Sequence, residues 1–310
     1  MKAVQYRNYG GPEVLEVTDI PDPKMFADQI LVRIEAAALN PADVQFQSGV
    51  VDSLVDALFP VTPGWDLAGV VEQAGVATTG FRPGDEVIGF VRGPAQHYGT
   101  YAEKITAEPR QLVRKPKNLD WAEAAGLPVA GLTAYQAIVE HLAVTAGDTV
   151  LVHGAAGGVG HLAVQIAVAR GARVLGTGSP ASQAFIESLG AEPVVYGDGL
   201  VEQVCKLVPD GVDVVLDCAG RGSLSTTQAL AAPGVRVATI TRAADYEGAV
   251  DVFLRLDTDD LSRLVELVEQ GKVTVHVDRR FTLDQAAEAQ QLVADGHVRG
   301  KVVLETRSGS

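Results

Sequence analysis

An apolar strand that leads directly into regularly spaced glycines constrains this chain more than any other feature. Residues 150–160 read VLVHGAAGGVG. The apolar spacing over 161–169 predicts a helix, and the β-branched run at 173–176 predicts a further strand. Strand, glycine turn, helix and strand fit one βαβ unit of about 30 residues. The sequence therefore predicts a parallel α/β arrangement in this part of the chain.

The glycine turn has the composition of a phosphate site. Backbone N–H groups converge on a phosphate pair at a helix N-terminus, and glycine removes the Cβ atoms that would block the approach. Gly154, Gly157 and Gly160 supply that access in the spacing G-x-x-G-x-x-G. We predict a dinucleotide cradle here, with the alternative that the pattern is only a strand-to-helix turn. Its predicted cofactor contacts are Gly154, Ala155, Ala156, Gly157, Gly158, Val159 and Gly160.

The residues after the second predicted strand bear on the choice of dinucleotide. An NAD site usually has Asp or Glu at this point, whereas this chain reads Thr177-Gly178-Ser179 and has no acid before Glu187. A 2′-phosphate would meet no like charge, so NADPH is favoured over NADH, with Ser179 as a hydroxyl donor. The alternative is a site that does not discriminate, because no Lys or Arg lies between residues 174 and 186.

Composition excludes several classes of protein. With 310 residues and 47% hydrophobic residues, the chain is long enough for about two domains. A net charge of −14 argues against nucleic acid or an anionic membrane as a partner. Two cysteines, Cys205 and Cys218, are too few for a disulfide framework, and no signal peptide or apolar run long enough to span a bilayer is evident. We expect a cytoplasmic protein.

The chain changes pattern along its length. Residues 1–119 carry short β-branched runs separated by Pro and Gly turns, typical of a mostly β, barrel-like domain. Residues 120–272 alternate strands and helices, which predicts a doubly wound parallel sheet, and 273–310 form a βαβ-like return. The predicted strands are 30–34, 69–72, 86–90, 150–152, 174–176, 194–195, 212–216, 235–240, 273–277 and 301–304, and a helix is predicted over 283–295.

Several separated segments together resemble one family over nearly the whole chain. They are Leu39–Asp43, Pro63–Val71, Phe81–Val87, Gly99–Glu103, Leu127–Tyr135, the glycine turn and Gly296–Val303. In order and spacing they resemble the medium-chain dehydrogenase/reductase superfamily, in its zinc-free NADPH:quinone oxidoreductase branch. The resemblance implies a GroES-like domain, a Rossmann domain, a C-terminal return that completes the first domain, and a homodimer.

The resemblance also bears on metal chemistry. Zinc alcohol dehydrogenases of this superfamily use a Cys, a Gly-His-Glu segment and a later Cys or Asp to polarise an alcohol oxygen. Here the first position falls near Leu39-Asn40, and Gly64-Trp65-Asp66 replaces Gly-His-Glu. Since Trp cannot ligate zinc, no metal is expected. The chemistry that remains is hydride delivery to an acceptor that needs little polarisation.

Further site residues follow from the resemblance. Asn40 and Asp43 would face the nicotinamide and orient a ribose hydroxyl or an acceptor carbonyl, although Asn before Pro41 is also an ordinary turn residue. The residues implied along the rest of the cofactor are Thr133, Tyr196, Ala219, Phe253 and Leu254. The alternative for Thr133 is a helix-capping hydroxyl, for Tyr196 a tyrosine packed at the end of a strand, and for Phe253 and Leu254 packing in the core.

Residues 44–51, VQFQSGVV, lack a tyrosine that several relatives carry there as a proton donor. His97 and Tyr98 are candidates by chemistry, with a solvated loop as the alternative for His97; otherwise solvent supplies the proton. Residues 50–59 would line or cover the acceptor pocket, or form a core-facing helix.

The chain is thus expected to be an NADPH-dependent oxidoreductase acting on a small-molecule quinone or α,β-unsaturated carbonyl. One alternative is an enoyl reductase of a polyketide or acyl-thioester pathway. Another is a non-catalytic protein that binds or senses NADPH.

Overall fold

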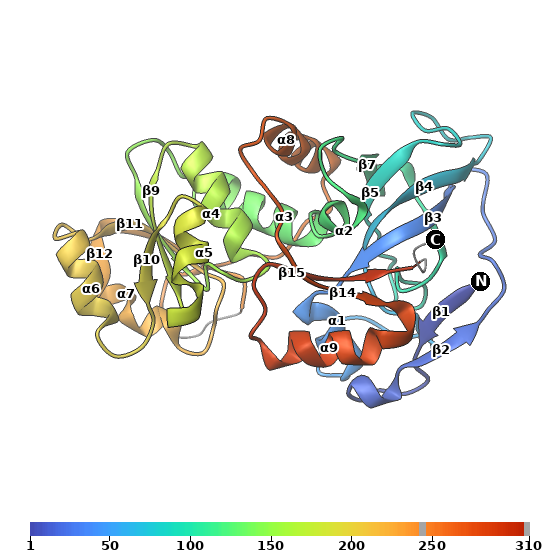
Figure 1. Cartoon of the computed structure of the whole chain (residues 1–310), viewed down its shortest axis with the longest axis horizontal. Coiled ribbons are helices and arrows are strands. Elements are labelled where there is room, and N and C mark those ends of the chain that lie inside the picture. Colours follow the sequence, from blue (N-terminus) through green and yellow to red (C-terminus); the bar gives the residue numbers. More distant parts are fainter. Residues whose placement is uncertain (242–245, 307–310) are drawn as a thin grey trace. The chain divides into compact units, whose positions relative to one another are not determined.

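The computed structural model describes residues 1–241 and 246–306, and it divides the chain into two compact units. Unit 1 comprises Met1–Val129, Leu256–Glu269 and the chain from Val275 onward; unit 2 comprises Ala130–Arg255 and Gln270–Thr274. The last four residues of the predicted C-terminal return, 307–310, lie outside the described residues. Figure 1 labels most of the helices and strands of both units.

Unit 2 is built on a parallel sheet of six strands in the order β10-β9-β8-β11-β12-β13. This is the order of a doubly wound nucleotide-binding fold, in which the first strand lies at the centre and the chain switches direction beside it. The strands are β8 (Thr149–His153), β9 (Arg173–Gly178), β10 (Glu192–Val195), β11 (Val212–Asp217), β12 (Ala231–Thr239) and β13 (Val250–Asp251). The predicted Rossmann architecture is confirmed.

Helices alternate with these strands, shown from green to orange in Figure 1. They are α4 (Gly160–Ala169), α5 (Gln183–Ser188), α6 (Leu200–Leu207) and α7 (Thr227–Leu230), with short 3₁₀ turns η4 (Pro180–Ser182) and η5 (Ser223–Thr226). The central strands β8 and β11 are buried along almost their whole length and mostly apolar, because both faces of a parallel sheet are covered. Their side chains form one core, with Leu151, Leu175 and Val215 fully buried.

Unit 1 is mostly β, as predicted. Its main sheet has the order β14-β15-β3-β4-β5-β7, and β6 also pairs with β3; β1 and β2 form a separate pair. The strands are β1 (Lys2–Gln5), β2 (Glu16–Asp19), β3 (Ile30–Ala38), β4 (Asp66–Ala74), β5 (Glu86–Phe90), β6 (Lys104–Ala107), β7 (Leu112–Arg114), β14 (Val277–Thr282) and β15 (Lys301–Glu305). β15 joins strands from the two ends of the chain, because it pairs with both β14 and β3.

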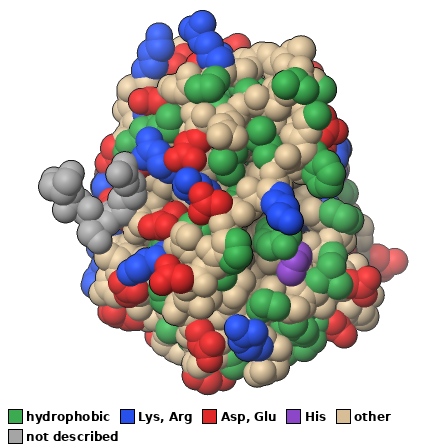
Figure 2. Space-filling model, turned by 90° about the vertical axis from the view of Figure 1, so that its right-hand side faces the viewer, with side chains coloured by type: hydrophobic (Ala, Val, Ile, Leu, Met, Phe, Trp, Pro, Cys, Tyr) green, Lys and Arg blue, Asp and Glu red, His purple; other side chains and the backbone are tan. Residues whose placement is uncertain are grey.

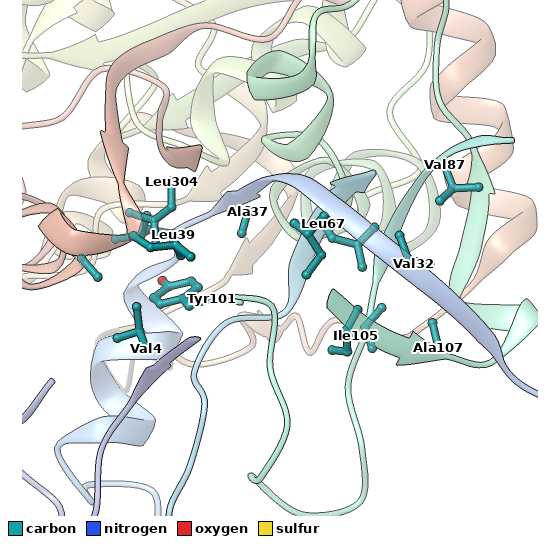
Figure 3. Packing of buried hydrophobic residues seen from close by; sticks show 14 of the residues in the cluster. Val4, Val32, Ala37, Leu39, Leu67, Val87, Tyr101, Ile105, Ala107 and Leu304 are labelled. Carbon is teal, nitrogen blue, oxygen red and sulfur yellow. The ribbon is translucent and has the colours of Figure 1, made fainter. Parts of the chain in front are cut away.

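The helical elements of unit 1 are α1 (Pro41–Gln47), α2 (Trp121–Ala125), α8 (Thr258–Glu269), α9 (Ala286–Asp295), η1 (Pro12–Val14), η2 (Pro109–Gln111) and η6 (Leu283–Gln285). A further helix, α3 (Pro128–Tyr135), continues into a π-helical segment, η3 (Gln136–His141). The buried core includes Val32, Leu67 and Leu304, which Figure 3 labels among the packed hydrophobic side chains. None of the helices among the described residues combines the length and apolar character needed to cross a bilayer.

Two local predictions are wrong. The strand expected over 273–277 begins only at Val277, because the side chain of Gln165 bonds both backbone groups of Thr274 and takes them out of any ladder. Residues 50–59 do not form a core-facing helix: they are a run of turns with Val50, Leu54 and Leu58 exposed. The apolar residues there recur every fourth position, as in an amphipathic helix, but the segment does not fold as one, and this row of side chains stays exposed.

Candidate functional site

The glycine turn lies between β8 and α4 and packs the helix tightly onto the strand end. Gly154 has a left-handed φ of 70°. A Cβ atom on Gly160 would lie 2.1 Å from the carbonyl oxygen of Gly154, so only glycine fits there. Among the described residues, no side chain caps the N-terminus of α4. The cradle therefore fits a dinucleotide pyrophosphate, with backbone N–H groups free of a competing cap and no Cβ in the way.

The end of β9 lies beside this turn. The buried hydroxyl of Thr177 accepts the N–H of Gly154 at 3.2 Å, and the carbonyl of Thr177 accepts the N–H of Ala155 at 3.0 Å. Thr177 therefore holds the turn from behind. Ser179, just past the strand, is partly exposed, with its hydroxyl 3.2 Å from that of Ser182.

Tyr196 follows β10 directly and reaches the same edge. Its N–H donates to the carbonyl of Gly178 at 3.2 Å, and the residue is 60% exposed. The alternative that Tyr196 is a tyrosine packed at the end of a strand is thus wrong. Ser179 and Tyr196 thus bring two hydroxyl groups to the end of β9. Residues 177–179 include no carboxylate.

Asp217 organises the end of β11, a role that the sequence predictions missed. One carboxylate oxygen accepts the N–H groups of Ala219 and Gly220, each at 2.9 Å, and the hydroxyl of Ser223 at 2.6 Å. The other accepts the hydroxyls of Thr239 and Thr241 at 2.9 and 3.0 Å. Burial raises the pKa of this carboxyl, but these donors outweigh burial, so its pKa lies below the usual value.

The Asp217 network places Ala219 next to the glycine turn. Ala219 is exposed, and a Cβ atom on Gly154 would lie 3.3 Å from that of Ala219. An acid that ends an apolar strand, as in VDVVLD, is the signal by which Asp217 could have been found.

The segment after β13 carries Phe253 and Leu254. Phe253 is 62% exposed and Leu254 partly exposed, so neither belongs to the interior. Arg255, the residue after Leu254, makes two backbone hydrogen bonds with the side chain of Gln136. The Gln136 amide donates to the carbonyl of Arg255 and accepts its N–H, each at 3.0 Å. Gln136 begins the π-helical segment, a distortion common near functional sites.

Thr133 is the sixth residue of α3 and nearly buried, so it does not cap the helix.

Unit 1 holds Asn40 and Asp43 in a buried polar network with Asp66, Tyr101 and Lys301. Asp43 accepts the N–H of Asn40 at 2.8 Å and the hydroxyl of Tyr101 at 3.0 Å. The Asn40 amide donates to Asp66 at 2.9 Å and accepts from Lys301 at 2.6 Å. Figure 3 shows the Tyr101 ring beside Leu39, the residue before Asn40. The turn before Pro41 is thus part of a charged cluster.

The charges in this network are unequal, with two carboxylates and one ammonium. Burial raises the pKa of Asp43 to about 7, with the hydrogen bonds to Asn40 and Tyr101 opposing the rise and the charge of Asp66 adding to it. Burial also raises the pKa of Asp66, which the Lys301 ammonium counteracts at 3.6 Å. The pKa of Lys301 is lowered by burial. The sequence predictions missed Asp66, Tyr101 and Lys301 because their partners are distant in the chain.

An aromatic cluster adjoins the network at Trp65. Its ring packs edge-on against Phe46, with ring centroids 5.0 Å apart, and against Phe90, at 5.8 Å. Among the described residues, no group of three or more His, Cys, Asp or Glu side chains is arranged to hold a metal ion.

The loop candidates for proton donation lie at the surface of unit 1. The His97 ring lies against that of Tyr98, with centroids 3.9 Å apart and planes tilted by 48°, and its Nδ1 lies 2.6 Å from the carbonyl oxygen of Leu58. Tyr98 is 67% exposed. This placement fits the alternative that His97 is a histidine of a solvated loop.

The face of the molecule drawn in Figure 2 shows acidic and basic side chains intermixed with hydrophobic ones.

Comparison with known proteins agrees with this architecture. A family model described as an alcohol dehydrogenase GroES-like domain matches residues 27–117, and one described as a zinc-binding dehydrogenase matches residues 189–304. A chloroplastic NADPH-dependent alkenal/one oxidoreductase of Arabidopsis thaliana is 36% identical, over 98% of this chain and 79% of its own length. A chloroplastic quinone-oxidoreductase of Triphysaria versicolor is 32% identical over 98% of each chain.

A solved structure described as an NAD-dependent alcohol dehydrogenase superposes with a TM-score of 0.91, at 34% identity, over 99% of this chain and 100% of its own. The identity and coverage of these relatives extend through both units. The chain belongs to the medium-chain dehydrogenase/reductase superfamily, in its quinone oxidoreductase branch.

Proposed function

We propose that this protein is an NADPH-dependent reductase that transfers a hydride to a quinone or an α,β-unsaturated carbonyl. The observation that carries the proposal is the glycine turn beside a strand end that offers hydroxyl groups and no carboxylate: Ser179 and Tyr196 could donate to a 2′-phosphate that an acid would repel. The names of the Arabidopsis and Triphysaria relatives support the two acceptor classes.

In this proposal the chain's own residues bind and orient. The backbone of residues 154–160 holds the pyrophosphate, Ser179 and Tyr196 hold the adenosine end, and Ala219, Phe253, Leu254 and Thr133 line the path toward the nicotinamide. A bound NADPH supplies the hydride. Asn40 and Asp43 orient the reacting partners, and water supplies the proton that completes the hydroquinone or the saturated ketone. No covalent residue is required.

The test has two arms. Binding of NADPH and NADH to the purified protein is measured by cofactor fluorescence, and tighter binding of NADH would overturn the cofactor assignment. NADPH oxidation is then followed optically with a panel of quinones, enones and enoyl thioesters. Reduction of thioesters alone would favour the biosynthetic enoyl reductase, and tight NADPH binding without oxidation of any acceptor would favour the binding or sensing protein.

The proposal extends to assembly and location. We infer a homodimer from the family, and light scattering during size exclusion that gave a monomer would refute it. We infer a cytoplasmic location because Cys205 and Cys218 are free thiols, as a reducing compartment maintains. Imaging of the tagged full chain in its host cells checks this, and an organellar signal would contradict it.

A further inference from the structure

The side-chain amide of Asn40 is held between opposite charges. Its oxygen lies 2.6 Å from the Lys301 ammonium nitrogen, and its nitrogen lies 2.9 Å from a carboxylate oxygen of Asp66. All three side chains are at least nine-tenths buried, with exposed fractions of 5% for Asn40, 3% for Lys301 and 0% for Asp66. Water therefore screens these interactions little.

This arrangement allows one orientation of the amide. Rotating the carboxamide by half a turn would place its NH₂ group against the ammonium and its oxygen against the carboxylate, so both contacts would become repulsive. The Asp66 carboxylate cannot follow such a rotation, because its other oxygen accepts the N–H of Val129 at 2.7 Å. An amide nitrogen has two N–H groups, and Asp66 takes one of them.

We propose that Lys301 is a positioning residue that, with Asp66, fixes the Asn40 amide so that its second N–H is offered in one direction to an oxygen of the acceptor or the cofactor. The inference rests on the proposed function, in which Asn40 orients a reacting partner. Lys301 lies in β15 and reaches Asn40, at the N-terminus of α1, from the other end of the chain.

Neutralising buried charge is the competing role for Lys301. The charged and titratable groups that face its ammonium are Asp66 at the start of β4, Asp43 in α1 and, through Asp43, Tyr101. A lysine that only balances these carboxylates would stabilise the fold without acting through Asn40. The two roles differ in whether removing Lys301 still matters once the Asn40 amide is gone.

The experiment is a double-mutant cycle in the full chain with Asn40→Ala, Lys301→Met and the double variant. The readouts are kcat and KM for a naphthoquinone and the NADPH dissociation constant from cofactor fluorescence. We expect each single variant to lower kcat/KM by about tenfold to a hundredfold, and the double variant to be no worse than Asn40→Ala. Lys301→Arg should recover part of the loss, since it keeps the charge.

Lys115→Met is the matched control, since Lys115 is also a nearly buried lysine of unit 1, paired with Glu86 at 3.4 Å and lying over the Trp121 ring. It should leave kcat/KM unchanged. Multiplicative losses in the double variant, or an unchanged Lys301→Met, would overturn the proposal. If Lys301→Met does not fold, Asp66→Asn/Lys301→Met, which removes both charges, replaces it in the cycle.

The inference and the proposed function fail in different ways. If the wild-type chain reduces no acceptor, the proposed function fails, and the cycle is read on the NADPH dissociation constant alone. The positioning role is then still supported if Asn40→Ala weakens NADPH binding and the double variant binds NADPH no more weakly than Asn40→Ala. An unchanged affinity in all three variants overturns it.

Discussion

The carbonyl oxygen of Gly154 occupies the space that a Cβ atom on Gly160 would need, 2.1 Å away. Two glycines six residues apart thus set the closeness of α4 to the end of β8. The contact is with backbone, which cannot move aside as a flexible side chain can, so the fold of the turn depends on glycine at position 160.

Gly160→Ala should destabilise unit 2 by about 2–4 kcal/mol, because α4 must shift away from the strand. Gly157→Ala should be milder, since its Cβ would lie 3.3 Å from the same oxygen. Urea unfolding measures the first effect, and NADPH titration followed by fluorescence measures both. Equal stability of the two variants would contradict the steric account.

Asp217→Asn should weaken NADPH binding by about tenfold and destabilise the fold by about 2–4 kcal/mol, because an amide cannot accept all five hydrogen bonds. Asp213→Asn is the control: it lies on the same strand but at the opposite end, accepting the N–H of Thr149 at 2.8 Å. Isothermal titration with NADPH compares the two. A similar loss of NADPH affinity in both variants would mean that the effect does not depend on the end of β11 at which Asp217 lies.

The pH dependence of stability should carry the signature of Asp43. Its pKa is raised in the folded protein to about 7, so the folded state holds a proton that the unfolded state has lost above about pH 4. The free energy of unfolding contributed by this group therefore falls as the pH rises from about 4 to about 7. Asp43→Asn should flatten that fall, as measured by urea unfolding across the range. An unchanged slope would show that Asp43 is ionised throughout.

Ser179→Asp should shift the preference toward NADH by about tenfold or more, because a carboxylate after β9 repels the 2′-phosphate and accepts from ribose hydroxyls. Ser188→Asp adds the same charge at an exposed position near the end of α5 and should leave the ratio unchanged. The ratio of the two dissociation constants is the measurement. A shift of equal size in both variants would indicate a general effect of net charge.

Patterns confined to short stretches could be predicted from the sequence. β5 was predicted with its observed bounds, and β8 and α4 to within a residue at each end, because apolar periodicity and glycine punctuation are local signals. The limits of β14 could not be predicted, since its start depends on Gln165, more than a hundred residues earlier.

The candidate site divides in the same way. The glycine turn and the acid-free strand end are contiguous in sequence and were predicted directly. Lys301 begins a strand that was predicted over 301–304, but nothing near it in the chain indicates that it reaches Asn40. Buried charge networks depend on pairings between distant strands, which one sequence does not display.

The insertion of β15 between β14 and β3 has a consequence for synthesis. The chain of unit 2 is made without interruption from Ala130 to Arg255, with a few residues added soon after, so its sheet can form on a growing chain. Most strands of the unit 1 sheet precede unit 2 in the chain, yet β15, which carries the Lys301 ammonium of the Asn40 network, follows it. During translation Asp43 and Asp66 therefore have no Lys301 ammonium beside them until the whole of unit 2 and then β15 have been made.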